Sequence, residues 1–192
     1  MNVVLVRHGE TEWSRSGKHT GRTNVPLTEK GRADAERLSS CLSGWSFARV
    51  FTSPLQRATE TCRLAGLAEG SEIREDLREW DYGEYEGRTT PTIREERPGW
   101  SLWTDGVPGG ERAEEVGARA DRVIEEVRGA GGDVVLFGHG HMLRVLTARW
   151  IALAPEDGSR FGLDPATIGV LGYERETPVI LRWNQPCGAP GD

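Results

Sequence analysis

The chain has 192 residues, of which 36% are hydrophobic and 28% are charged, so it can bury one sizeable core without needing a second domain. Its formal charge of -6 at pH 7 argues against nucleic acid or an anionic membrane as a partner, because both require a net basic face. We therefore expect a single domain over residues 1–184, followed by a disordered tail over residues 185–192.

The cysteines and the N-terminal segment indicate a cytoplasmic protein. Cys41, Cys62 and Cys187 are odd in number, widely spaced and without a C-x-x-C pair, so no disulfide framework or zinc site is readable and reduced thiols are expected. The segment before Arg7 is too short for the apolar part of a signal peptide. No apolar run reaches the length of about 18 residues that a membrane span requires.

Strand-like and helix-like segments alternate along the chain. In chain order we expect a strand at 3–6, a helix at 28–42, a strand at 49–52, a helix at 55–64, an irregular insertion at 80–110, a helix at 111–127, a strand at 134–137, a helix at 141–153, and strands at 169–173 and 179–183. This alternation predicts an α/β fold, namely a three-layer α/β/α sandwich with a mainly parallel central sheet.

Polar groups follow several of the predicted strands at the points where they end. The first strand is followed by Arg7-His8-Gly9, the second by Ser53-Pro54 with Arg57, and the strand at 134–137 by Gly138-His139-Gly140. Ligands of parallel sheets bind at the carboxyl ends of the strands, so these groups are expected to meet in one site. Two guanidinium groups, two imidazoles and a helix N-terminus suit a bound phosphoryl group.

Several motifs also occur in a fixed order between residue 3 and about residue 173. They are Arg7-His8-Gly9-Glu10-Thr11, Gly21 with Pro26-Leu27-Thr28 and Gly31, Ser53-Pro54-Leu55-Gln56-Arg57-Ala58, Leu77-Arg78-Glu79 with Gly83 and Glu86-Gly87, Gly109-Gly110-Glu111, and Gly138-His139-Gly140. This ordered set resembles the histidine phosphatase superfamily, which includes the cofactor-dependent phosphoglycerate mutases and the broad-specificity phosphatases related to them.

The resemblance implies a hydrolase that acts on small phosphorylated metabolites through a phosphohistidine intermediate. His8 would be the nucleophile, and Glu79 would donate a proton to the leaving oxygen. Arg7 and Arg57 would hold the nonbridging oxygens, while His139 would donate a hydrogen bond to the phosphoryl group. Further contacts with the phosphate or the substrate are implied for Ser14, Thr20, Gly21 and Gly140. The resemblance implies no metal and no other cofactor.

Two departures from the family pattern bear on the activity. Position 14 is Ser where many members carry Asn, which shortens the reach to the phosphate. The mutases carry a longer, basic insertion, whereas the segment 91–108 holds only Arg94 and Arg97 as bases, and Asp81 and Glu84 precede it. We therefore favour a phosphatase over a mutase, because few cations are available to retain a second phosphate.

Other interpretations stay open. A cofactor-dependent phosphoglycerate mutase is the main alternative within the family, and a noncatalytic phosphate-binding regulatory module is the alternative of another class. A metal-dependent hydrolase could use His139 and His141, and a chelator would then abolish its activity. A dinucleotide site at Gly138-His139-Gly140 is disfavoured, because Leu143 stands where a third glycine is needed. The sequence leaves the oligomeric state open, with a homodimer as one candidate.

Overall fold

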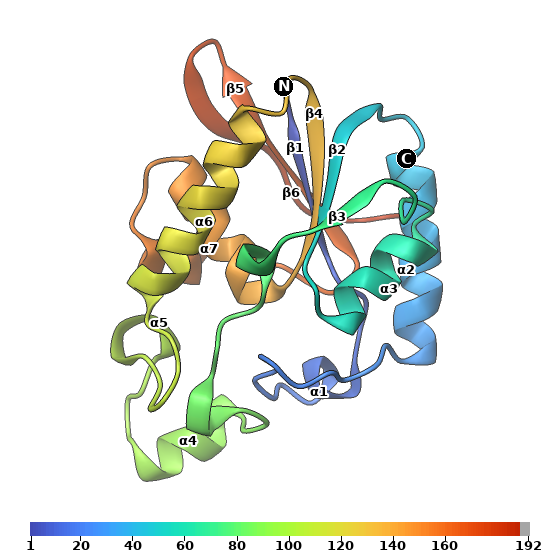
Figure 1. Ribbon diagram of the computed structural model, residues 1–192. Helices are drawn as coiled ribbons and strands as arrows, with labels where there is room; N and C mark the ends of the chain where they lie inside the picture. Colours follow the sequence, from blue (N-terminus) through green and yellow to red (C-terminus); the bar gives the residue numbers. More distant parts are fainter. Residues whose placement is uncertain (189–192) are drawn as a thin grey trace.

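The computed structural model describes residues 1–188, whose six strands form one sheet (Figure 1). The strands are β1 (Val3–Arg7), β2 (Phe47–Thr52), β3 (Ser71–Ile73), β4 (Asp133–Gly138), β5 (Thr167–Glu174) and β6 (Thr177–Pro186), and their spatial order is β3-β2-β4-β1-β5-β6. The five strands expected from the sequence are present. The additional strand, β3, lies at the edge of the sheet and is too short to show an alternating pattern.

The register of the parallel strands brings three strand ends together. β3, β2, β4 and β1 run parallel to one another, whereas β5 pairs antiparallel with β1 and with β6. Arg7 lies beside Gly138, and Thr52 lies beside Phe137. The polar residues that follow β1, β2 and β4 are therefore neighbours at one edge of the sheet (Figure 1).

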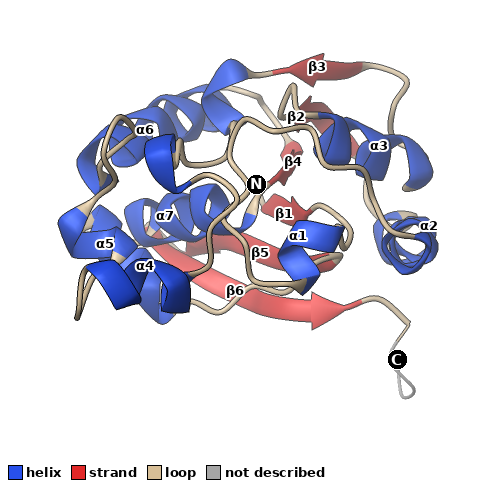
Figure 2. Ribbon diagram, turned by 90° about the horizontal axis from the view of Figure 1, so that it is seen from below, coloured by secondary structure: helices blue, strands red, loops and turns tan. Residues whose placement is uncertain are grey.

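Helices cover both faces of the sheet (Figure 2). The helices are α1 (Glu12–Arg15), α2 (Glu29–Leu42), α3 (Gln56–Leu64), α4 (Thr90–Glu96), α5 (Leu102–Asp105), α6 (Ala113–Arg128) and α7 (Gly140–Trp150). Val4 of β1 belongs to an apolar cluster with α2 and α3, whereas its neighbour Leu5 belongs to a cluster with α6 and α7. The expected three-layer α/β/α sandwich is thus confirmed. No helix within residues 1–188 is long and apolar enough to span a membrane.

The segment 80–110 is more regular than the sequence indicated. It contains α4, α5 and a 3₁₀ turn at Gly83–Tyr85. Its aromatic residues contribute to the core, because buried Tyr85 packs edge-on against buried Trp100 with ring centroids 5.3 Å apart. The prediction of an irregular insertion was wrong here, since elements of four to seven residues show too little periodicity to be recognised.

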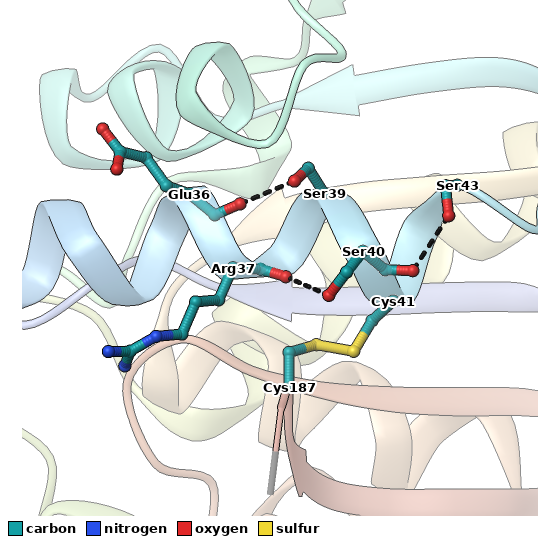
Figure 3. The surroundings of a disulfide bond; sticks show 7 residues. All are labelled: Glu36, Arg37, Ser39, Ser40, Cys41, Ser43 and Cys187. Carbon is teal, nitrogen blue, oxygen red and sulfur yellow. Dashed lines mark hydrogen bonds between the residues drawn. A yellow bond between two sulfur atoms is a disulfide. The ribbon is translucent and has the colours of Figure 1, made fainter. Parts of the chain in front are cut away.

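Two predictions about the C-terminal end and the cysteines were also wrong. Strand β6 continues to Pro186, so residues 185 and 186 of the predicted tail pair within the sheet; residues 187 and 188 are also described, and 189–192 lie outside the described residues. Cys187 forms a disulfide with Cys41 of α2 (Figure 3), while Cys62 is a free, buried thiol. The two bonded cysteines are 146 positions apart in the sequence, and only the packing of β6 beside α2 brings them together.

Candidate active site

A cavity of about 250 Å³ lies where the C-terminal ends of β1 and β4 meet the start of α7. Of the nine residues predicted for the site, six line this cavity: Arg7, His8, Ser14, Thr20, Glu79 and Gly140. The other three, Arg57, His139 and Gly21, lie outside its lining. The structure therefore brings the predicted nucleophile and the predicted proton donor to one cavity.

The His8 imidazole has one nitrogen available for reaction. Its Nδ1 lies 2.7 Å from the carbonyl oxygen of Gly9, and a carbonyl can only accept, so Nδ1 carries the proton and Nε2 is unprotonated. Burial, together with Arg57 and Arg7, holds the pKa of His8 well below its usual range. The ring is therefore neutral near pH 7, which leaves Nε2 as a nucleophile.

The glycine after His8 is required by a close approach of two backbones. A Cβ atom at Gly9 would lie 2.4 Å from the carbonyl oxygen of Gly31 in α2, which is too close for any side chain. The Gly9 N–H also donates to Thr61 Oγ1 at 3.0 Å. The chain after β1 is thereby fixed against both α2 and α3, and His8 is fixed with it.

Arg7 brings an unmatched cation to the cavity. Its Nη1 donates to the carbonyl oxygen of Leu163, but its buried Nε has no hydrogen-bond partner within residues 1–188. A Cβ atom at Gly140 would lie 3.3 Å from the guanidinium group, so a glycine keeps this side of Arg7 open. A buried charged donor without a partner is costly, and an anion in the cavity would satisfy it.

Arg57 and His139 form a hydrogen-bonded chain behind the cavity lining. Fully buried Arg57 donates from Nε to His139 Nδ1 at 3.1 Å, from Nη1 to Thr23 O at 3.0 Å, and from Nη2 to Thr20 O and Gly21 O, each at 2.9 Å. Because Nδ1 of His139 accepts, its Nε2 carries the proton and donates to Ser53 Oγ at 2.7 Å. Burial, together with Arg57, holds the pKa of His139 well below its usual range.

The loop that accepts the Arg57 hydrogen bonds is held by Glu86. The Glu86 carboxylate accepts from the backbone N–H groups of Gly21 and Thr23, both at 3.0 Å. Glu86 is thus linked through this loop to Arg57. In the sequence, Glu86-Gly87 stands out only as part of the family motif, and no local signal identifies this contact, since the partners are more than 60 positions apart.

Glu79 is buried beside the first turn of α7. Its Oε1 accepts from the N–H groups of Trp80 and Met142, each at 2.9 Å, and its Oε2 accepts from the N–H of His141 at 3.1 Å. The first N–H groups of a helix have no partner within the helix, so Glu79 satisfies two donors of α7. The same contacts orient the carboxyl group beside the cavity that His8 lines.

An ion pair outside the cavity holds the segment that carries Glu79. Arg119 of α6 donates from Nε and Nη2 to the Glu111 carboxylate, both at 2.8 Å, and from Nη1 to the carbonyl oxygens of Asp76 and Arg78. Glu111 in turn accepts the Trp80 indole N–H at its carbonyl oxygen, at 2.9 Å. Glu79 therefore lies between two residues, 78 and 80, that are tied to this pair.

Neutral side chains form much of the remaining wall. The Tyr82 hydroxyl shares a hydrogen bond of 2.7 Å with His141 Nδ1, and burial raises the pKa of Tyr82 well above its usual range, so the hydroxyl keeps its proton. Burial also holds the pKa of His141 well below its usual range and lowers that of His19 to about 4. The cavity wall thus offers hydrogen-bonding groups that stay uncharged near pH 7.

Of the three loop residues predicted to contact the substrate, Ser14 and Thr20 line the cavity and Gly21 does not. Ser14 lines the cavity, but its hydroxyl also exchanges hydrogen bonds with the backbone of Thr11 and caps α1. Thr20 lines the cavity while its carbonyl accepts from Arg57. Gly21 lies behind the lining, where a Cβ atom would be 2.6 Å from Glu86 Oε2.

The residues that favoured a phosphatase over a mutase do not line the cavity. Asp81 pairs with Arg22 at 2.6 Å, and Arg94 and Arg97 donate to acceptors within their own segment. The cations that do line the cavity beside Arg7 are Lys18 and Arg144, which the sequence did not single out. The charge argument against a mutase therefore has no support in the structure.

The histidines expected for a metal-dependent hydrolase are engaged in other contacts. His139 uses both ring nitrogens within the Arg57 and Ser53 chain, and His141 Nδ1 shares a hydrogen bond with the Tyr82 hydroxyl. Within residues 1–188, no group of three or more His, Cys, Asp or Glu side chains is arranged to hold a metal ion.

Comparison with known proteins agrees with this geometry. The chain is 43% identical over 176 residues to an acid phosphatase of Mycobacterium tuberculosis, covering 90% of this chain and 86% of that protein. It is 34% identical to a 2,3-bisphosphoglycerate-dependent phosphoglycerate mutase of Gloeobacter violaceus, covering 80% of this chain and 77% of that protein. A solved structure of an open reading frame product of Mycobacterium tuberculosis superimposes with a TM-score of 0.92 at 40% identity, covering 96% of this chain and 97% of that one.

A protein-family model matches almost all of residues 1–188. The model of the histidine phosphatase superfamily (branch 1) matches residues 3–186, from the first strand to the last. The predicted family and the predicted type of enzyme are therefore confirmed. Together with the shared fold and the ordered motifs, this match shows that the chain belongs to the histidine phosphatase superfamily.

Proposed function

We propose that this protein hydrolyses small phosphomonoesters through a phosphohistidine formed on His8. The proposal rests on one observation, which is that His8, Glu79 and Arg7 line the same cavity. The Nε2 atom of His8 carries no proton, and the buried Nε of Arg7 has no hydrogen-bond partner within the described residues. These three residues are the nucleophile, the proton donor and the anion-binding group that such a reaction requires.

In the first step, His8 Nε2 attacks the phosphorus atom while the bond to the leaving oxygen breaks. Arg7 stabilises the charge on the nonbridging oxygens, and the Glu79 carboxyl donates its proton to the departing alcohol. In the second step a water molecule attacks the phosphohistidine, Glu79 accepts its proton, and inorganic phosphate leaves. The bond between phosphorus and His8 Nε2 breaks with its electron pair returning to the nitrogen, and the proton that Glu79 gave to the alcohol is replaced by one from the water, so both residues regain their starting states.

Arg57 and His139 have a supporting place in this proposal. Four of the five Arg57 N–H donors already bond to protein acceptors, so one Nη1 N–H is available for a phosphoryl oxygen. His139 would reach the phosphoryl group only by exchanging its bond to Ser53 Oγ. The positive charge of Arg57 also contributes, after burial, to the lowered pKa of His8.

The test is release of phosphate by the purified protein without added metal. We expect turnover of p-nitrophenyl phosphate and of several sugar phosphates, inhibition by vanadate, and a phosphoenzyme that is acid-labile and alkali-stable after rapid quenching with radiolabelled substrate. Absence of phosphate release from every substrate would overturn the proposal.

A phosphoglycerate mutase is the second candidate, because a relative of that name aligns with 80% of the chain and because Lys18 and Arg144 add cations to the cavity. The two activities are separated by measuring both phosphate release and exchange of 3- and 2-phosphoglycerate in the presence of bisphosphoglycerate. We expect release to be the faster reaction. Faster exchange would replace the phosphatase by the mutase, and neither reaction would favour a noncatalytic phosphate-binding module.

The cellular location and the oligomeric state of the protein stay predictions. A cytoplasmic location and a homodimer rest on the sequence alone, and the Cys41–Cys187 disulfide calls for a direct test of the location. The cavity of about 250 Å³ supports a substrate of modest size, since pockets for drug-sized ligands begin at about 300 Å³.

A further inference from the structure

The cavity carries more positive charge than one phosphoryl group requires. Its charged lining consists of Arg7, Lys18 and Arg144 as cations and Glu79 as the one carboxylate among the described lining residues. The three histidines of the lining do not add charge near pH 7, because burial lowers the pKa of each. Arg7, with Arg57 behind it, suffices to hold the phosphoryl group in the proposed function.

Lys18 and Arg144 line the cavity without a carboxylate partner in this acidic protein. Thirteen lysines and arginines form ion pairs within residues 1–188, whereas neither Lys18 nor Arg144 has a carboxylate partner there. Acidic residues outnumber basic ones by 30 to 24, so partners are abundant elsewhere on the molecule. Two cations that line the same cavity without a carboxylate partner attract an anion from solution.

Arg144 is held in position on the first turns of α7. Its Nε donates to Gly158 O and its Nη2 to Ser159 O, both at 3.1 Å, and its guanidinium group lies 4.7 Å from the Trp103 ring centroid. Its Nη1 makes no hydrogen bond within the described residues, although the side chain is only partly exposed. A guanidinium group fixed in this way loses little side-chain entropy when it binds a ligand.

Lys18 approaches the same cavity from the N-terminal loop. Its ammonium group lies 5.6 Å from the Trp13 ring centroid and is exposed, so it can move towards a bound ligand. The neighbouring backbone is anchored, because Lys18 pairs with Thr89 in an isolated β-bridge. The cavity thus combines a fixed cation from α7 with a mobile one from the loop.

We propose that Lys18 and Arg144 form a subsite for a second anionic group of the substrate, so that the preferred substrates are small phosphomonoesters bearing a carboxylate or a second phosphate. This inference rests on the proposed function and specifies its substrate class. It does not imply a mutase, since binding of the second anion leaves open whether water or another acceptor takes the phosphoryl group from His8.

The test compares pairs of substrates that differ only in the second anionic group. One pair is 3-phosphoglycerate and glycerol 1-phosphate, which differ by a carboxylate, and the other is propane-1,3-diol bisphosphate and its monophosphate. The quantity measured is the ratio of kcat/KM within each pair. For the wild-type protein we expect at least one ratio of about 10 or more, the size expected for a hydrogen bond to a charged group. The pair with the larger ratio identifies the second anion.

Substitutions then locate the subsite. Arg144→Gln should lower the larger ratio by about 10-fold, and Lys18→Gln by a smaller factor because its exposed charge is screened. Arg63→Gln is the control, since it removes an exposed arginine outside the cavity and should leave the ratio unchanged. Thermal melting checks that Arg144→Gln still folds. If it does not, the ratio measured for Lys18→Gln tests the subsite.

The proposal and the proposed function fail in different ways. Wild-type ratios near one, or ratios that Lys18→Gln and Arg144→Gln lower no more than Arg63→Gln does, would overturn the subsite while phosphate release continues. Loss of the proposed function would instead appear as no phosphate release by the wild-type protein from any substrate, p-nitrophenyl phosphate included.

Discussion

His8 follows a central strand directly, whereas Glu79 lies in a segment without helix or strand between the 3₁₀ turns Glu75–Leu77 and Gly83–Tyr85. The N–H of His8 donates to Gly138 O at 3.0 Å, which extends the pairing of β1 with β4 by one residue. Backbone hydrogen bonds of the sheet therefore position the nucleophile. The proposed acid has no such support and depends on side-chain contacts with α6 and on the first turn of α7.

This difference indicates how each region responds to substitution. Removing one side chain near His8 leaves the pairing of β1 with its neighbours in place, so the ring keeps its position. Removing one partner of the Glu111–Arg119 pair frees the segment that carries Glu79. Substitutions outside the cavity should thus impair proton donation more than nucleophilic attack.

The largest effect is expected for His8→Ala. Loss of the nucleophile should reduce turnover of all phosphomonoesters by at least about 10⁴-fold, because the remaining groups cannot form the intermediate. The melting temperature should stay close to that of the wild type, since the ring lies at the cavity and not in an apolar cluster. Substantial turnover by a folded His8→Ala protein, measured as phosphate release, would refute the nucleophile assignment.

Glu79→Gln should have the next largest effect, and it should depend on the leaving group. Alkyl phosphates need a proton on the leaving oxygen, so their turnover should fall by about 10²- to 10⁴-fold, whereas aryl phosphates should lose far less. Glu75→Gln is the matched control, because Glu75 is exposed and pairs only with Arg78. Steady-state kinetics on both substrate types decide the matter, and equal losses would show that Glu79 acts otherwise.

Arg119→Gln tests whether the acid depends on the pair outside the cavity. Displacement of Glu79 by a fraction of an ångström to one ångström should slow alkyl phosphates by up to about 10²-fold. Aryl phosphates should again be affected less, which distinguishes misplacement of the acid from general loss of structure. Arg122→Gln, one turn along α6 in an exposed pair with Asp76, should have little effect. Equal behaviour of the two variants would mean that the contacts of Glu79 with the first turn of α7 suffice to place it.

The last effect is a dependence of stability on pH, which comes from the buried histidines. The pKa values of His8, His19, His139 and His141 are all lowered, so below about pH 6.5 the unfolded chain binds more protons than the native one. The free energy of unfolding should be highest above this pH and fall as the pH decreases, by at most about 1.4 kcal/mol per pH unit for each histidine. Urea unfolding between about pH 7.5 and about pH 5.5 measures the slope.

His19→Gln sharpens the pH prediction, because the His19 pKa is lowered to about 4 and the glutamine cannot titrate. Its unfolding free energy should depend less steeply on pH than that of the wild type. A wild-type stability that does not change over this range would show that the histidine pKa values are not lowered in the native protein.

The sequence by itself determined the features that are coded locally. Runs of Val, Leu and Ile identified the five longer strands, and the residues that follow three of them, Arg7-His8-Gly9, Ser53 and His139, could be placed at one edge because parallel strands end together. The frame from Leu77 to Gly83 likewise singled out Glu79 by its resemblance to a family motif. Local patterns suffice here because side-chain periodicity and strand direction follow from the backbone.

Only the tertiary structure decided the contacts between distant segments. The bond of Arg57 to the loop at Thr20 and Gly21, the pairing of Arg119 with Glu111 beside Glu79, and the disulfide between Cys41 and Cys187 have no local signal in the sequence. The same holds for the cavity charge, to which Lys18 and Arg144 contribute beside Arg7, whereas Arg94 and Arg97 do not. A side chain's partners depend on how helices and loops pack across the sheet, and this packing is a property of the whole chain.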